Sequence, residues 1–161
     1  MFQIRVLRNE SVAKKISDFL TGKNAFEQTW APNEKKIVVE AVKESIGKKK
    51  HRYWYIEDKG QIIVAMGVRE NKYGSGGYEM DEDYLAVHTD YRNRGLATAL
   101  INEVERFVKK NKGRYIHVLT CDIRSYEAAR NFYEKMGYIK VAEIPDYYVK
   151  GEGRIDYFKK I

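Results

Sequence analysis

Apolar and polar positions along the chain follow two different periods, and the changes between them predict the order of the elements. Alternation with period two predicts strands at residues 2–7, 53–57, 61–70, 78–88, 115–121, 138–144 and 155–158. Apolar residues three and four positions apart predict helices after Ser11, after Pro32, over 95–111 and after Ser125. The order β-α-α-β-β-β-α-β-α-β-β has no repeat or linker, so it predicts one α/β domain over 1–161, a mixed sheet with helices on its faces.

Turn and capping residues mark the expected ends of these elements. Asp58-Lys59-Gly60 between two apolar runs is typical of a β-hairpin. Ser11 and Ser125 are expected to cap the helices that follow them. The segment 145–153 is expected to be a loop between the last two strands.

The composition excludes several classes of protein. Among 161 residues, 43% are hydrophobic and 33% charged, which is typical of a folded globular domain. No apolar stretch is long enough to span a bilayer, and Met1 opens directly into a strand pattern without a leader, so we expect a cytoplasmic protein. The single Cys121 excludes an internal disulfide, and no metal site is expected. The net charge of +7 is spread out, which favours solubility and attraction to a polyanionic ligand over nucleic-acid binding.

The segment 85–100 carries the most specific signal. An apolar strand end at 85–87 leads through a polar turn to Arg92-Asn93-Arg94-Gly95-Leu96-Ala97, where a helix begins. The first turn of a helix leaves amide N–H groups without partners, and the helix dipole favours negative charge there. Small residues allow a ligand to approach the backbone, and the two arginines add positive charge. The segment therefore predicts a cradle for a diphosphate-sized anion.

An acidic cluster occupies the strand just before this cradle. Strand alternation places Glu79, Asp81 and Asp83 on one face and Glu82 on the other. Acidic residues are depleted in strands, so the cluster calls for a functional explanation, although a solvated strand end is an equal alternative.

Two motifs together resemble the GNAT superfamily of acyl-CoA-dependent N-acyltransferases. The first is Arg92-x-x-Gly95-x-Ala97, and the second is the run 129–138, in which Phe132-Tyr133 precedes Glu134-Lys135-Met136-Gly137-Tyr138. The resemblance is specific over 78–138 and implies a GNAT-like fold whose strands 85–87 and 116–121 splay apart around acetyl-CoA. Tyr126 stands where many members have an asparagine that contacts the cofactor. The implied cofactor-binding residues are Leu85, Ala86, Val87, Arg92, Asn93, Arg94, Gly95, Leu96, Ala97, Thr98, Tyr126 and Tyr133.

The resemblance implies an N-acetyltransferase that moves the acetyl group of acetyl-CoA to a primary amine directly, in a ternary complex. Tyr133 becomes the candidate general acid for the leaving thiolate, with a core tyrosine as the alternative, and Asp81 and Asp83 are candidate bases. Carboxylates in the cleft would favour a cationic small molecule or a protein amine as acceptor. The candidate acceptor-binding residues are Glu79, Trp30, Tyr147 and Tyr148.

Other readings of the residues stay open. Relatives are often homodimers, and neither a nucleic-acid nor a membrane partner is expected. A non-catalytic acyl-CoA-binding regulatory domain and, further away, a basic nucleic-acid-associated protein are the alternative functions. His88 and His117 fit structural positions better than a base, and Cys121 reads as a small apolar residue with no activating neighbour.

Overall fold

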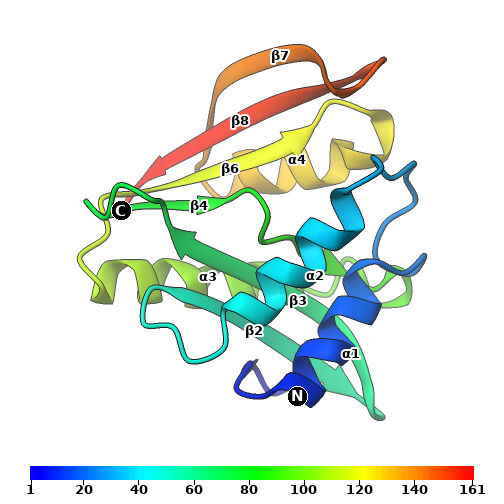
Figure 1. Cartoon of the computed structure of the whole chain (residues 1–161), viewed down its shortest axis with the longest axis vertical. Coiled ribbons are helices and arrows are strands. Elements are labelled where there is room, and N and C mark those ends of the chain that lie inside the picture. The colour runs from blue at the N-terminus through cyan, green and yellow to red at the C-terminus, as the bar shows by residue number, and fades with distance from the viewer.

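A computed structural model describes all residues from 1 to 161. Four α-helices flank an eight-stranded mixed sheet, as Figure 1 shows. No helix combines the length and apolar character needed to cross a membrane. The elements are β1 (Arg5–Val6), α1 (Glu10–Leu20), α2 (Glu34–Glu44), β2 (His51–Asp58), β3 (Gln61–Glu70), β4 (Gly77–Met80), β5 (Leu85–Val87), α3 (Leu96–Lys110), β6 (Tyr115–Cys121), α4 (Glu127–Lys135), β7 (Ile139–Val149) and β8 (Glu152–Lys160).

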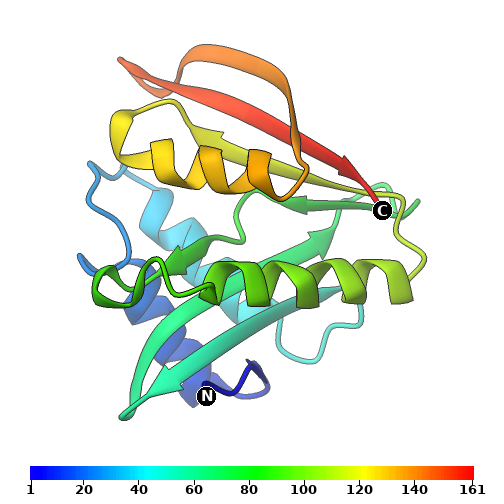
Figure 2. The same ribbon diagram turned by 180° about the vertical axis from the view of Figure 1, so that it is seen from behind.

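The sheet carries helices on both faces, as the sequence pattern predicts. The strand order is β1-β2-β3-β4-β6-β8-β7, and β5 pairs with β3 alone. Helices α1 and α2 lie in front of β2 and β3 in Figure 1, and the reverse view in Figure 2 shows α3 and α4 on the other face. Two hydrophobic clusters result, one between α1, α2 and the sheet and a larger one beneath α3 and α4. The mixed α/β architecture is confirmed.

The predicted long strand at 78–88 is wrong, because it breaks into β4 and β5. Strand β4 pairs in parallel with β6 up to Met80 and Val118, whereas Leu85 to Val87 pair antiparallel with β3 only. Between them, Asp83 turns inward to Arg69 and His51, which lie on neighbouring strands. The strands β5 and β6 therefore separate beyond this break, and the expected splay of the central pair is confirmed.

Several element ends also differ from prediction. Asn9, not Ser11, caps α1, because its side chain accepts a hydrogen bond from the Val12 amide at 3.0 Å. Ser125 lies inside a 3₁₀ turn, Arg124–Tyr126, so it does not cap α4. The hairpin between β2 and β3 is confirmed, with Lys59 and Gly60 both at positive φ, at 50° and 81°.

The last two strands are longer than predicted, and the first is shorter. Most of the expected loop at 145–153 belongs to β7 and β8, which turn tightly next to Gly151 at φ 87°. The pairing of β7 with β8 resumes at Val149 and Glu152 after an irregularity that follows Ile144, so both strands run beyond the apolar segments from which they were predicted. Tyr147 and Tyr148 consequently lie on a strand, and β1 keeps only two residues.

Candidate functional site

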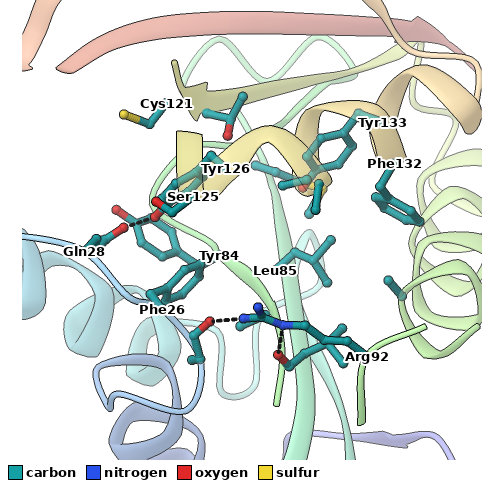
Figure 3. A pocket seen from close by; sticks show the side chains of 18 of the residues that line it. Phe26, Gln28, Tyr84, Leu85, Arg92, Cys121, Ser125, Tyr126, Phe132 and Tyr133 are labelled. Carbon is teal, nitrogen blue, oxygen red and sulfur yellow. Dashed lines mark hydrogen bonds between the residues drawn. The ribbon is translucent and has the colours of Figure 1, made fainter. Parts of the chain in front are cut away.

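A cavity of about 800 Å³ opens where β5 and β6 separate. Its wall combines the loop between α1 and α2, the segment joining β4 to β5, the first turn of α3, the end of β6, the helix α4, and Tyr148 and Glu152 of the last hairpin. Figure 3 shows Leu85 and Arg92 on one side and Tyr126 and Tyr133 on the other. Segments far apart in the sequence thus meet around one space.

The N-terminus of α3 forms one end of this cavity. Gly95 adopts the left-handed conformation at φ 74°, and Asn93 precedes it at φ 60°. The first α3 amide with a helical acceptor is that of Ala99, which donates to the Gly95 carbonyl at 3.0 Å. The amides of Leu96, Ala97 and Thr98 have no partner, and all three residues line the cavity. This end therefore suits an anion, as predicted from the motif.

The two arginines of the motif are tethered to the backbone. Arg92 donates to the Val87 carbonyl at 3.2 Å and to the Ala25 carbonyl at 3.0 Å. Arg94 donates to the Asp90 carbonyl at 3.0 Å and lies over the Tyr91 ring, 4.9 Å from its centroid. Arg92 lines the cavity, but Arg94 does not. Amide groups therefore make up more of the cradle than the sequence motif suggests.

The splayed strand β5 has one edge without a strand partner along the cavity, although Arg92 donates to its Val87 carbonyl. Leu85, Ala86 and Val87 line the space and form ladder pairs with β3 only, so the opposite edge of β5 has no strand partner. A ligand with amide groups can bond to such an edge as an added strand does.

Tyr133 projects from α4 into the middle of the cavity. The residue is 5% exposed, and its ring packs against Phe132, Tyr138 and Tyr157. Its hydroxyl forms no hydrogen bond with another residue of the chain, while the residue lines the cavity (Figure 3). Burial raises the pKa of the Tyr133 phenol, so this hydroxyl keeps a proton that it can donate to a group in the cavity.

The three carboxylates predicted on one strand face are separated by the break between β4 and β5. Asp81 lines the cavity but is exposed, and partial desolvation by the surrounding chain raises its pKa against the opposing effects of Arg154 and His117. Asp83 also borders the cavity, but its side chain is fully buried and bonded to Arg69 Nε at 2.5 Å and His51 Nε2 at 2.6 Å. This placement does not support Asp83 as a base.

Glu79 lies outside the cavity wall. It is half-buried on β4, in register with His117 of β6, and partial burial raises its pKa. The structure therefore does not bring it to the acceptor end, where the sequence predicts it.

The aromatic residues expected at the acceptor end are only partly there. Tyr148 lines the cavity, whereas Trp30 and Tyr147 do not. Trp30 stacks behind Tyr84 with ring centroids 6.5 Å apart, and Tyr147 accepts a hydrogen bond from Arg154 at 3.1 Å. No motif marks many of the other lining residues, among them a polar and aromatic group that the fold brings together: Phe26, Gln28, Glu34 and Tyr84.

The remaining titratable candidates take structural positions. His88 is buried, and its Nδ1 accepts a hydrogen bond from the Asp90 amide at 3.2 Å. His117 pairs with Asp156 at 2.8 Å, on a half-exposed face of the sheet and not in the core. Cys121 borders the cavity, but burial raises the pKa of its thiol, which disfavours a nucleophilic thiolate.

Comparison with known proteins decides the family. The family model described as the acetyltransferase (GNAT) domain matches residues 49–140, which is more than half of the chain. The chain belongs to the GNAT acetyltransferase family. The chain is 34% identical over 73 residues to N-alpha-acetyltransferase 30 of Schizosaccharomyces pombe, which covers 45% of this chain and 47% of that protein. The chain thus spans about half the length of this curated relative.

Solved structures show the same fold over almost the whole GNAT domain. A GNAT-family protein from Desulfovibrio desulfuricans has a TM-score of 0.81 at 21% identity, with 99% of both chains covered. An aminoglycoside 6'-N-acetyltransferase complexed with coenzyme A has a TM-score of 0.75 at 20% identity, with 98% of this chain and 96% of that chain covered. At these identities the likeness establishes the fold.

Proposed function

We propose that the GNAT domain transfers the acetyl group of acetyl-CoA to a primary amine of a cationic small molecule or a protein. The observation that carries this proposal is one cavity joining the open amides of α3, the free hydroxyl of Tyr133 and the carboxylate of Asp81. The relatives supply the reaction class, since one is named an N-alpha-acetyltransferase and another acetylates aminoglycosides and binds coenzyme A.

The residues of the cavity fit coenzyme A. The unpaired amides of Leu96, Ala97 and Thr98 would hold the diphosphate, and the free edge of β5 would bond to the amides of the pantetheine arm. Tyr126 borders the same space. Acetyl-CoA supplies an activated thioester as the acyl donor.

Two side chains of the cavity would transfer the protons of the reaction. An alkylamine has a pKa of about 10.4, so the acceptor must lose a proton before it can attack. Asp81, acting through water, takes that proton. Tyr133 Oη gives its own proton to the departing sulfur and recovers one from the nitrogen that becomes the amide, so the products are the amide, the free thiol of coenzyme A and a proton on Asp81. The amine attacks directly in a ternary complex, since burial raises the pKa of Cys121, the one thiol of the chain, and so disfavours an acyl-enzyme on it.

Two measurements test this function. Calorimetry with coenzyme A is expected to show saturable binding. Release of free thiol from acetyl-CoA is expected to rise with at least one amine of a panel of spermidine, kanamycin and a four-residue peptide with a free α-amine. Absence of coenzyme A binding would refute the proposal. Binding without thiol release from any amine would instead identify the regulatory acyl-CoA-binding domain.

A further inference from the structure

Four polar side chains form a hydrogen-bonded chain along the acceptor end of the cavity. The Tyr84 hydroxyl donates to Glu34 Oε1 at 2.7 Å, and Gln28 Nε2 donates to the same oxygen at 3.1 Å. The Tyr126 hydroxyl donates in turn to Gln28 Oε1, a contact drawn in Figure 3. All four residues line the cavity, and they come from three parts of the chain: the loop leading into the start of α2, the segment between β4 and β5, and the turn before α4.

The carboxylate of Glu34 determines which group donates in each hydrogen bond among these four side chains. An ionised carboxylate can only accept hydrogen bonds, so Tyr84 and Gln28 must both donate to it. The amide nitrogen of Gln28 is then committed to Glu34, which leaves its oxygen to accept from Tyr126. The Ala31 amide also donates to Glu34, at 3.0 Å, and fixes the side chain at the start of α2.

The phenol oxygens at this end are consequently acceptors toward the cavity. A hydroxyl has one proton to donate, and Tyr84 and Tyr126 both direct theirs away to Glu34 and Gln28. Tyr148 directs its proton to the Thr120 carbonyl at 3.4 Å. Burial and nearby carboxylates raise the pKa of all three phenols, so they stay neutral acceptors. Tyr133 differs from these three, because its hydroxyl has no partner in the chain and its proton stays available to a group in the cavity.

The aromatic rings and the charges around these oxygens favour a cation. The Phe26 ring stacks on Tyr126 with centroids 5.8 Å apart and meets Tyr84 edge-on at 5.6 Å. Aromatic faces attract ammonium groups. Carboxylates act on the phenols of this end: Glu34 and Glu152 raise the pKa of Tyr126, and Asp81 raises that of Tyr148. The two basic side chains of the lining, Arg92 and Lys135, come from the cofactor cradle and the last turn of α4. The lining carboxylates other than the ion-paired Asp83 are Glu27, Glu34, Asp81 and Glu152.

We propose that this end is an ammonium subsite, which holds the protonated aliphatic primary amine of the acceptor against the phenol oxygens of Tyr84 and Tyr126. Glu34 is the positioning residue: it orients both hydroxyls and compensates the positive charge from behind them. The proposal rests on the proposed acetyl transfer and adds how the acceptor is chosen. Amines that are protonated at neutral pH should bind better than the same molecules with a hydroxyl in place of the amine.

Two variants test the subsite independently. Glu34→Gln keeps an oxygen for the Ala31 amide but no longer dictates the proton direction, and Tyr84→Phe keeps the ring but removes one acceptor oxygen. Glu40→Gln removes the same charge from the exposed side of α2, where Glu40 meets only Lys36 at 3.9 Å, and serves as the matched control. For each protein, calorimetry measures the affinity for coenzyme A and then, at saturating coenzyme A, for the three amines of the panel.

The expected result is a loss of amine affinity of about tenfold or more in both Glu34→Gln and Tyr84→Phe, as when a hydrogen bond to a charged group is lost. The affinity for coenzyme A and the amine affinity of Glu40→Gln should stay within twofold of the parent. Where turnover is observed, KM for the amine should rise more than kcat falls. The panel shows whether a polyamine, an aminoglycoside or a peptide presents the amine.

The outcomes separate this inference from the proposed function. If an amine binds and depends on Glu34 and Tyr84, but no thiol is released, the subsite stands and the enzymatic proposal fails. If acetyl transfer occurs while amine affinity in both variants stays within twofold of the parent, the subsite is refuted and the enzyme stands. Equal affinity for an amine and its hydroxyl counterpart in the parent protein also refutes it.

Discussion

Replacing Tyr133 with phenylalanine should remove most of the activity and almost none of the stability. The hydroxyl has no hydrogen-bond partner in the chain, so Tyr133→Phe breaks no bond and leaves no group unsatisfied. The free energy of unfolding should therefore change by less than about 0.5 kcal/mol. A general acid contributes about 10²- to 10⁴-fold to a rate, so turnover should fall by that factor, or by about 3–5 kcal/mol of activation free energy.

Tyr157→Phe is the matched control for this experiment. Its ring lies beside Tyr133, with centroids 6.0 Å apart, but its hydroxyl donates to Glu134 at 2.8 Å. This variant should lose about 1 kcal/mol of stability and keep its turnover. Urea unfolding measures the first quantity, and thiol release at saturating acetyl-CoA measures the second. Turnover of Tyr133→Phe within twofold of the parent would refute the role of Tyr133 as the acid. A loss of stability in Tyr133→Phe as large as that in Tyr157→Phe would show a structural role for the Tyr133 hydroxyl.

Three further perturbations test other parts of the site. Because the base must be deprotonated and the pKa of Asp81 is raised, kcat/KM should climb with pH through a value above the usual aspartate range, and this limb should vanish in the pH profile of Asp81→Asn. Asp83→Asn leaves the Arg69 guanidinium without its buried partner, so urea unfolding should show a loss of about 3 kcal/mol. Gly95→Ala meets no atom within 4 Å but must adopt φ 74°, which costs about 1–2 kcal/mol and should weaken coenzyme A binding in calorimetry.

Local patterns predicted the elements well wherever one segment decides its own conformation. Strand β6 was predicted with its observed ends, and the turn at Lys59-Gly60 follows from Gly60, which tolerates positive φ. The prediction of one strand over 78–88 was wrong because its conformation depends on residues elsewhere in the chain. Its alternation continues through Asp83, yet the chain breaks there because Asp83 binds Arg69 and His51, and no local pattern reveals partners on other strands.

The same distinction divides the two ends of the cavity. The open amides at the start of α3 could be predicted because consecutive residues form them, from the turn at Gly95 to the first turn of the helix. The orientation of Arg92 could not be predicted, because it depends on the carbonyl of Ala25, 67 positions away. Contiguous motifs therefore mark the end proposed for the cofactor, and the opposite end depends on tertiary contacts.

Tyr126 stands where many relatives have an asparagine, and its contacts in the fold explain what the larger side chain does. By sequence it replaces an asparagine that helps to hold the cofactor in many relatives, so it reads as the loss of one contact. In the fold its hydroxyl reaches Gln28, 98 positions earlier in the chain, and its ring stacks on Phe26. An asparagine side chain is too short to make that bond and has no ring to stack. If the proposed ammonium subsite holds, the residue at position 126 therefore binds the acceptor amine and not the cofactor.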